Sequence, residues 1–192
     1  MAAGDENELI RMIKTSVLID DRPSSFRFPR GFGSRQNIEK QHSSLEVGKG
    51  RILQEGNSIA LINFGARLEA CLETIEFLSR KGFKITLADA RFAKPLDTGL
   101  LDNILDNHEY VLTIEEGSIG GFSSVILDYI HNKRKKRTSS IIQNLIFPDK
   151  FISHDSSDNQ YKEIGMDAKS IEKKILSMIV SKEIDIKSIK NI

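Results

Sequence analysis

Short apolar runs alternate with longer segments of helical periodicity along the middle of the chain. Residues 59–63 and 110–114 are nearly continuous apolar runs, as expected of strands covered on both faces. Residues 83–89 and 141–147 also have the character of strands. Apolar positions recur at helical spacing in the segment that ends at Lys81-Gly82 and in residues 97–105, 122–131 and 168–180. This alternation predicts an α/β fold with a mostly parallel sheet and helices on both faces.

The first part of the chain has a different pattern. Residues 5–18 are predicted to form a helix, capped by Asp5, with an apolar stripe that includes Met12 and Val17. Residues 25–28 alternate in the manner of a short strand. One helix and one strand cannot bury an apolar face by themselves. We therefore expect residues 1–45 to be mobile or loosely docked unless a partner covers them.

Residues 31–58 are rich in Ser, Gly, Gln and Asn and are predicted to form a linker, with an edge hairpin at residues 45–53. The last residues, 181–192, are predicted to form a frayed tail.

Composition excludes several classes of protein. The formal net charge of +1 indicates neither nucleic acid nor an acidic membrane as a partner. No apolar run reaches the length that crosses a bilayer, and the N-terminus lacks the features of a signal peptide. A single cysteine, Cys71, excludes an internal disulfide framework and indicates a reducing compartment. The predicted location is the cytoplasm.

Candidate chemistry gathers where the predicted strands end. Residues 88–97, ADARFAKPLD, follow one strand, and residues 110–122, YVLTIEEGSIGGF, contain the next. The carboxyl ends of parallel strands are where sites usually form in open α/β sheets. In the first segment, Arg91, Lys94 and Asp97 could bind substrate or could shape an elbow. The elbow is favoured, with Arg91 pairing with Asp89 or a neighbouring subunit.

The second segment has two adjacent acids, Glu115 and Glu116, whose side chains point to opposite sides of an extended backbone. They cannot act as a paired general acid and base. One of them is predicted to face the helix N-terminus opened by Gly120-Gly121, where an acid is favoured. A phosphate site in this glycine turn is disfavoured, because the acids beside it would repel an anion.

Other chemistry-bearing residues receive structural interpretations. His42, His108, His131 and His154 do not stand at metal-ligand spacing, so no metal site is predicted. The consecutive letters of residues 153–156, SHDS, indicate a loop, since hydrolase triads are assembled from distant positions. The basic run 133–137, KRKKR, is interpreted as a solvated loop, with nucleic-acid contact as the alternative. Arg27 and Arg30 flank a strand end, where guanidinium groups can hold phosphate or can pair with Asp20 or Asp21.

Several long motifs, in order, make the chain closely resemble the C-terminal region of 1-deoxy-D-xylulose-5-phosphate synthases. The motifs are DENE at 5–8, DDRPSSFRFPRG at 20–31, LEVGKGRIL at 45–53, INFGARLEA at 62–70, ADARFAKPLD at 88–97, TIEEGSIGGF at 113–122, FPDKFISH at 147–154 and YKEIGMDA at 161–168.

The resemblance implies a fold, an activity and partners. The family condenses pyruvate with glyceraldehyde 3-phosphate, for isoprenoid and thiamine synthesis, and uses thiamine diphosphate and magnesium as homodimers. It implies that residues 1–31 are a remnant of the pyrimidine-binding domain, residues 32–47 a linker, and residues 48–192 a transketolase-type C-terminal domain. Arg30, in the FPRG motif, aligns with the family arginine that grips the substrate's phosphate.

The same resemblance implies what this chain lacks. The family's diphosphate and magnesium site and its cofactor-activating glutamate lie upstream of the matching region. We therefore expect no catalytic, cofactor-binding or metal-binding residue in this chain, and no binding of thiamine diphosphate by it alone. The expected partners are the N-terminal domains of the synthase, without nucleic acid or membrane. The alternative is a non-catalytic dimerisation module, as in the beta subunits of 2-oxo-acid dehydrogenases, which share the fold.

Overall fold

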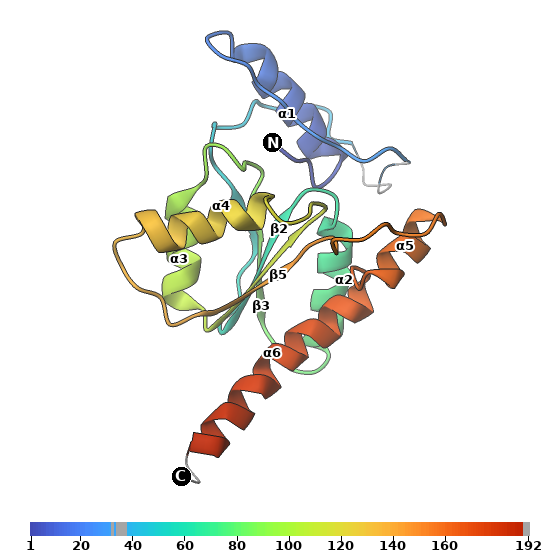
Figure 1. The fold of residues 1–192 in the computed structure, drawn as a ribbon. Helices are drawn as coiled ribbons and strands as arrows, with labels where there is room; N and C mark the ends of the chain where they lie inside the picture. Colours follow the sequence, from blue (N-terminus) through green and yellow to red (C-terminus); the bar gives the residue numbers. More distant parts are fainter. Residues whose placement is uncertain (32, 34–37, 190–192) are drawn as a thin grey trace.

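The core of the molecule is a single five-stranded sheet with helices on both faces (Figure 1). The computed structural model describes residues 1–31, 33 and 38–189. The strands lie in the order β1-β3-β2-β4-β5, with β2 to β5 parallel and β1 antiparallel to β3. Their bounds are β1 Arg51–Gln54, β2 Ile59–Phe64, β3 Ile85–Asp89, β4 Tyr110–Glu115 and β5 Ile141–Leu145. The predicted mostly parallel α/β sheet is therefore confirmed.

The helices divide into two layers. Helices α2 (Leu68–Ser79) and α6 (Ala168–Ile189) cover one face, and α3 (Thr98–Asn107) and α4 (Phe122–Asp128) cover the other. A π-helical turn, Tyr129–Lys133, extends α4. Two apolar clusters, one per face, fill the layers between helices and sheet. Every residue of β2, β3 and β4 is buried, which is why most of their side chains are apolar. The buried polar residues among them are Asn63, Thr86, Asp89, Thr113 and Glu115.

Two predicted boundaries were wrong, and one short helix was missed. Helix α6 continues to Ile189, so residues 181–189 are helical and not a frayed tail, and residues 190–192 lie outside the described residues. The predicted hairpin at 45–53 contributes only β1, because its N-terminal half forms a turn. A short helix, α5 (Ser157–Glu163), follows the 153–156 loop and was not predicted. Its residues are mostly polar and exposed, so it has no apolar periodicity to reveal it.

The N-terminal helix α1 (Glu6–Leu18) is confirmed, and Asp5 Oδ1 accepts the Glu8 amide at 2.8 Å as its cap. The predicted strand at 25–28 is wrong: it contributes only a single parallel bridge between Ala2 and Arg27. The extreme N-terminus is the only segment that pairs there within the described residues, and Ala3 N–H donates to the Arg27 carbonyl at 3.2 Å.

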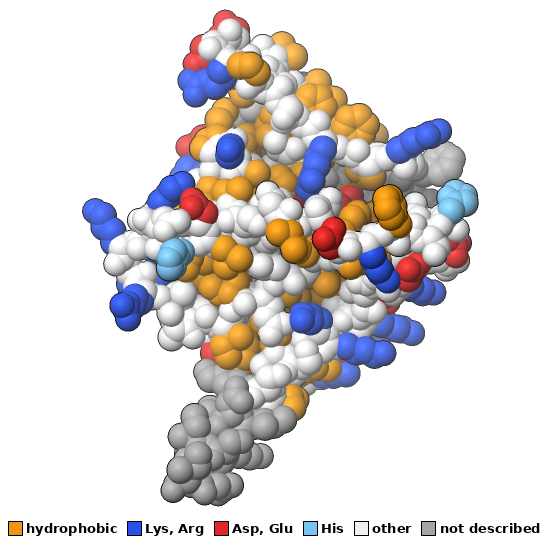
Figure 2. Space-filling model, viewed as in Figure 1, with side chains coloured by type: hydrophobic (Ala, Val, Ile, Leu, Met, Phe, Trp, Pro, Cys, Tyr) orange, Lys and Arg blue, Asp and Glu red, His pale blue; other side chains and the backbone are white. Residues whose placement is uncertain are grey.

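The outer face of α1 stays open. Met12 on this helix is fully buried, but the exposed fractions of its neighbours are 43% for Ile13, 77% for Val17 and 69% for Leu18. Phe28, which follows the bridge residue Arg27, is 59% exposed. Helix α1 lies apart from the sheet layers in Figure 1, and hydrophobic side chains reach the surface over that end of the molecule in Figure 2. The predicted apolar stripe of α1 is therefore only partly used. That residues 1–45 are mobile or loosely docked stays a prediction.

Candidate functional site

The carboxyl ends of β2, β3 and β4 meet at one edge of the sheet. Asn63 of β2 lies in register with Asp89 of β3 and with Ile114 of β4, and Phe64 lies in register with Glu115. The two segments singled out in the sequence, 88–97 with Asp89 and 110–122 with Glu115, are thus brought to the same edge. This edge faces the N-terminal segment and α1.

A buried ion-pair cluster joins α1 to the end of β3. Glu8 is fully buried, and its carboxylate accepts hydrogen bonds from Arg91 Nε at 2.7 Å and from Arg91 Nη2 at 2.9 Å. Arg51 Nη1 lies 3.0 Å from the same carboxylate, and Arg51 Nη2 lies 3.1 Å from Asp89 Oδ2. Arg51 Nη2 also reaches Asp5 Oδ2 at 3.4 Å. We call Asp5, Glu8, Arg51, Asp89 and Arg91 the elbow cluster.

The predicted pairing of Arg91 with Asp89 was wrong, and the alternative pairing with a neighbouring subunit stays a prediction. Arg91 pairs with Glu8, and Arg51, from the antiparallel edge strand, pairs with Asp89. The backbone of Arg91 has φ 57°, in the left-handed region, at the residue that begins the elbow. In this conformation the Arg91 guanidinium points toward Glu8 of α1 and not toward Asp89 of β3. Neither Glu8 nor Arg51 was singled out from the sequence, because both lie far from Arg91 along the chain.

Asp89 is a buried acid of the elbow cluster with a raised pKa. It is fully buried, and its Oδ1 has no hydrogen-bond partner within the described residues. Burial raises the pKa of Asp89 to about 6, while Arg51 opposes the rise and Glu8 adds to it. Three carboxylates share two closely bound guanidinium groups here. Asp89 therefore takes up a proton as the solution is acidified through about pH 6.

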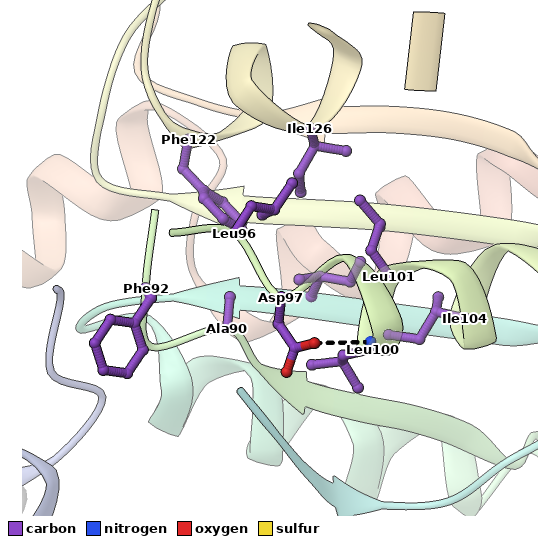
Figure 3. A pocket seen from close by; sticks show the side chains of 10 residues that line it. Ala90, Phe92, Leu96, Asp97, Leu100, Leu101, Ile104, Phe122 and Ile126 are labelled. Atoms are coloured by element: carbon purple, nitrogen blue, oxygen red, sulfur yellow. Dashed lines mark hydrogen bonds between the residues drawn. The ribbon is translucent and has the colours of Figure 1, made fainter. Parts of the chain in front are cut away.

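The rest of the elbow makes contacts that shape the backbone. Asp97 Oδ1 accepts the Leu100 amide at 3.0 Å and caps α3, and Asp97 Oδ2 accepts the Gly50 amide at 3.1 Å. Phe92 is buried, and the Lys94–Pro95 peptide is cis. Beneath the elbow lies an apolar cavity of about 10 Å³, no larger than one water (Figure 3). Its lining comprises Ile62, Ala90, Phe92, Leu96, Asp97, Leu100, Leu101, Ile104, Phe122 and Ile126.

Glu115 caps the helix that follows it, as predicted. Its Oε2 accepts the Phe122 amide at 2.8 Å, and its Oε1 accepts the Ser123 amide at 2.7 Å. The glycines of the turn fold around this carboxylate. A Cβ on Gly117 would lie 2.6 Å from Glu115 Oε2, and one on Gly121 would lie 2.4 Å from it. The glycine turn therefore holds an internal carboxylate where a bound anion would otherwise sit.

Glu116 turns the other way and meets residues that sequence reasoning missed. Its carboxylate accepts the Tyr161 hydroxyl, and Arg67 Nε lies 3.7 Å from Glu116 Oε1. The Arg67 guanidinium stacks over the Tyr161 ring, 3.6 Å from its centroid. Burial, followed by the Glu116 hydrogen bond, raises the pKa of Tyr161 to about 12. No motif signals this contact, because it joins the ends of β2 and β4 to α5.

Arg27 and Arg30, the two arginines at the N-terminal segment, differ in their surroundings. Arg27 lies over the Phe64 ring at 4.9 Å and places Nη2 3.9 Å from Glu115 Oε2. Arg30 is exposed, and it makes no ion pair in the part of the chain that the structure describes. Asp21 pairs with Arg22 and not with Arg27 or Arg30.

A groove lies between the N-terminal segment and the elbow. Its volume is about 560 Å³, and it opens beside Met1. The lining residues are Met1, Ile19, Asp21, Arg22, Pro23, Ser24, Ser25, Val47, Phe92, Ala93, Lys94 and Pro95.

The remaining candidates have structural contacts. In the basic run, Lys133 pairs with Asp128, while Arg134 is nearly buried between Asp102 and Asp106. His108 contacts the Thr86 hydroxyl through Nε2 at 2.7 Å.

Cys71 is the fully buried free thiol of helix α2, and burial raises its pKa to about 12. Across the described residues, no cluster of three His, Cys, Asp or Glu could hold a metal ion. No helix in the described ranges is long and apolar enough to cross a membrane.

Comparison with known proteins places this architecture in a family. The family model described as "Transketolase, C-terminal domain" matches residues 48–171, and the chain belongs to that family. The chain is also 42% identical, over 181 residues and 93% of its length, to the probable 1-deoxy-D-xylulose-5-phosphate synthase 2, chloroplastic, of Oryza sativa subsp. japonica. The resemblance to the synthases is therefore confirmed. The match spans about a quarter of the rice protein, 25%.

A solved structure supports the fold. The chain is similar to a protein titled "Split gene transketolase, inactive beta4 tetramer", with a TM-score of 0.61, 21% identity and coverage of 70% of this chain and 43% of that one. At this identity the likeness concerns the fold. The division of the chain at residues 31 and 47 stays a prediction. The cytoplasmic location also stays a prediction, and the rice protein's name assigns that protein to the chloroplast.

Proposed function

We propose that this chain is the C-terminal portion of a 1-deoxy-D-xylulose-5-phosphate synthase and supplies its assembly platform. The observation that carries the proposal is the identity to the rice synthase over 181 residues, which extends well beyond the domain at 48–171 and into the N-terminal segment. The reaction of the whole enzyme would be the condensation of pyruvate with glyceraldehyde 3-phosphate.

Thiamine diphosphate and magnesium would be held by other parts of that enzyme. A diphosphate needs free amides or cations, and the glycine turn of this chain is filled by the Glu115 carboxylate. Among the described residues no group of three acids, histidines or cysteines could hold magnesium, and the elbow carboxylates are paired with Arg51 and Arg91. The residues present thus do not fit the cofactor, and we infer that the chain is inactive alone.

The N-terminal segment is the part of the chain that would complete the active site. Its elbow cluster fixes α1 to the C-terminal domain through fully buried Glu8. The exposed apolar side chains of Ile13 and Val17 on α1 then face outward, toward the N-terminal domains that we propose as partners. Arg30, exposed and without an ion pair among the described residues, would grip the phosphate of glyceraldehyde 3-phosphate.

Reconstitution tests this function. The chain is produced alone and together with the upstream portion of the rice synthase, and turnover of pyruvate with glyceraldehyde 3-phosphate is measured. We expect turnover only from the combination, and no thiamine-diphosphate binding by the chain alone in calorimetry. Turnover or tight cofactor binding by the isolated chain would overturn the proposed inactivity.

Arg30→Ala in the reconstituted enzyme should raise the KM for glyceraldehyde 3-phosphate by about tenfold to a hundredfold, the range of a lost charged hydrogen bond, and leave the KM for pyruvate unchanged. Arg22→Ala is the matched control, because Arg22 is exposed and pairs with Asp21. An equal effect of both substitutions would remove the assigned role of Arg30.

The second candidate is a non-catalytic dimerisation module. The structural neighbour whose title calls it an inactive tetramer has the same fold, which favours stable self-assembly without catalysis. This candidate predicts a homo-oligomer that does not associate with the upstream portion of a synthase. Pull-down between the two portions, read beside the turnover assay, separates the two functions.

A further inference from the structure

Three successive hydroxyl residues lie in the connection between the π-helical turn and β5, and they differ in their surroundings. Thr138 Oγ1 donates to the Leu105 carbonyl at 3.2 Å, and Ser140 Oγ donates to the His108 carbonyl at 2.7 Å. Both side chains therefore fasten the connection to the end of α3. Ser139 between them is exposed, and its hydroxyl has no hydrogen-bond partner among the described residues. The Ser139 hydroxyl is thus the one of the three that an outside molecule can reach.

The basic run 133–137, which comes directly before these hydroxyls, divides into paired and unpaired cations. The cations that pair with acids of α3 and α4 are Lys133, Arg134 and Lys136. Lys135 and Arg137 are exposed, and neither makes an ion pair in the part of the chain that the structure describes. Residues 129–148 contain no Asp or Glu. The connection therefore carries two positive charges that no nearby acid along the chain offsets.

Two unpaired cations suit a single phosphoryl group better than a nucleic acid. Proteins that bind duplex DNA commonly contact about 6–10 phosphates, mostly through Lys and Arg. A phosphoserine carries a charge of about −1.5 to −2 at pH 7, which an ammonium and a guanidinium group balance. The three paired cations of the run are already neutralised by acids of the same chain. The charge left over therefore matches one modified hydroxyl.

We propose that Ser139 is a phosphorylation site, recognised by a protein kinase with an acidic substrate groove that receives the basic run. The Ser139 hydroxyl oxygen attacks the γ-phosphorus of ATP held by the kinase, and the bond from that phosphorus to the oxygen of the β-phosphate breaks. ADP leaves, and the hydroxyl proton passes to the kinase's catalytic aspartate. The new phosphoryl group then binds the free cations of Lys135 and Arg137.

The fold selects this acceptor, because the sequence alone offers three. Thr138 and Ser140 also follow the basic run, but both are half-buried, and phosphorylation of either would break its hydrogen bond to the end of α3. Residues 137–140 form neither helix, strand nor turn, so the segment around Ser139 can enter a kinase groove without unfolding an element. The inference does not depend on the proposed function.

Labelling of the full chain by a kinase tests the site. The probe is the catalytic subunit of cyclic-AMP-dependent protein kinase with magnesium ATP, and mass spectrometry locates the phosphoryl group. We expect the group on Ser139, and Ser139→Ala should abolish labelling while the chain stays folded, because this hydroxyl holds no contact. Ser157→Ala is the matched control and should keep labelling, since Ser157 is exposed but residues 153–156 before it include an acid and no Lys or Arg. Labelling of Thr138 or Ser140, or no labelling, would overturn the proposal.

Two charge substitutions separate recognition of the free cations from simple access to the hydroxyl. Arg137→Gln should lower kcat/KM for the kinase about tenfold or more, as expected of a lost hydrogen bond between charged groups. Lys133→Gln, which removes a cation already paired with Asp128, should leave kcat/KM unchanged. Equal effects of the two substitutions would refute recognition through the free cations.

Amide exchange tests the seat of the phosphoryl group. Residues 135–140 should exchange more slowly in the phosphorylated chain than in the unmodified one, because the phosphoryl group binds Lys135 and Arg137 and orders the connection. Unchanged exchange would refute that seat.

A short DNA duplex tests the competing use of the basic run. Fluorescence anisotropy of the labelled duplex should show no binding by the unmodified chain at physiological salt. Salt-sensitive binding that Lys135→Gln weakens would overturn the proposal in favour of a nucleic-acid surface.

Discussion

Arg91 holds the carboxylate of Glu8 in a two-point hydrogen-bonded pair, although the two residues are 83 positions apart in the chain. Glu8 is fully buried and Arg91 is mostly so. The pair therefore fastens α1 to the end of β3 at the point where the elbow begins. Paired geometry of this kind is specific to arginine, and a lysine could not reproduce it.

Removing the Glu8 carboxylate should detach α1. Glu8→Ala leaves Arg91 without its buried partner, and breaking a buried ion pair in this way costs about 3–5 kcal/mol. Because α1 lies outside the two helix layers of the sheet, we expect it to undock while the sheet stays folded, so the loss should appear as faster amide exchange in residues 6–18. Asp21→Asn, which removes an exposed acid, should leave exchange unchanged. Unaltered protection of α1 in Glu8→Ala would contradict an anchoring role for the pair.

Asp89 should make stability fall as the pH rises through about 6. Its folded-state pKa of about 6 lies above the ordinary 3.8, so the folded chain binds the proton more tightly than the unfolded chain. The contribution is fully present below about pH 4 and is lost as pH rises through the folded value, by up to about 3 kcal/mol. Asp89→Asn should flatten this slope in denaturant titrations.

Asp155→Asn provides the control for that titration. Hydrogen bonds from Asn159 and the Ser156 amide lower the pKa of exposed Asp155, so this acid titrates below the window in which Asp89 changes. Its replacement should leave the difference in unfolding free energy between pH 4 and pH 7 as it is in the wild type. A flattened slope in Asp155→Asn, with an unchanged one in Asp89→Asn, would exclude Asp89 as the source.

Gly121 should tolerate no side chain. A Cβ there would lie 2.4 Å from the Glu115 oxygen that caps α4, so Gly121→Ala must displace the cap. We expect a loss of about 1–3 kcal/mol in unfolding free energy, from crowding together with the lost cap. Gly31→Ala is the comparison, because nothing lies within 4 Å of its Cβ position. Chemical denaturation measures both, and equal stability of the two variants would exclude the crowding.

Tyr161 should tie α5 to the sheet through its hydroxyl. Tyr161→Phe keeps the ring beneath Arg67 but removes the hydrogen bond to Glu116, a bond to a charged group worth about 1.5–3 kcal/mol. The local effect should be faster amide exchange in residues 157–163. Tyr129→Phe removes a comparable hydroxyl, bound to Asp102, at a distant place and serves as control. Loss of protection at α5 in the control would show a global effect.

The elements of the fold were predictable because their signals are local. Strands such as β2 and β4 are nearly continuous apolar runs until Asn63 and Thr113, and α2 repeats its apolar residues at helical spacing. The cap made by Glu115 could also be foreseen, because acid and helix start lie seven residues apart in one glycine turn. Each of these inferences was possible because the residues concerned lie close together in the sequence.

The contacts across the site were not predictable in the same way. Arg51 and Arg91 each have an acid nearby in the elbow cluster, and only the folded chain decides that Arg51 takes Asp89. Likewise Tyr161 reaches Glu116 across 45 positions. A charged side chain has several oppositely charged residues along the chain with which it could pair. The order of the strands in the sheet decides which of them lies close enough to do so.

The buried thiol of Cys71 gives the molecule its own reporter of opening. It lies at zero exposure in the layer between α2 and the sheet, and its raised pKa keeps it protonated at neutral pH. A thiol reagent can reach it only in molecules whose sheet and helix have parted. Its labelling rate therefore counts openings of the core, whereas a cysteine introduced on α1 would count departures of that helix alone.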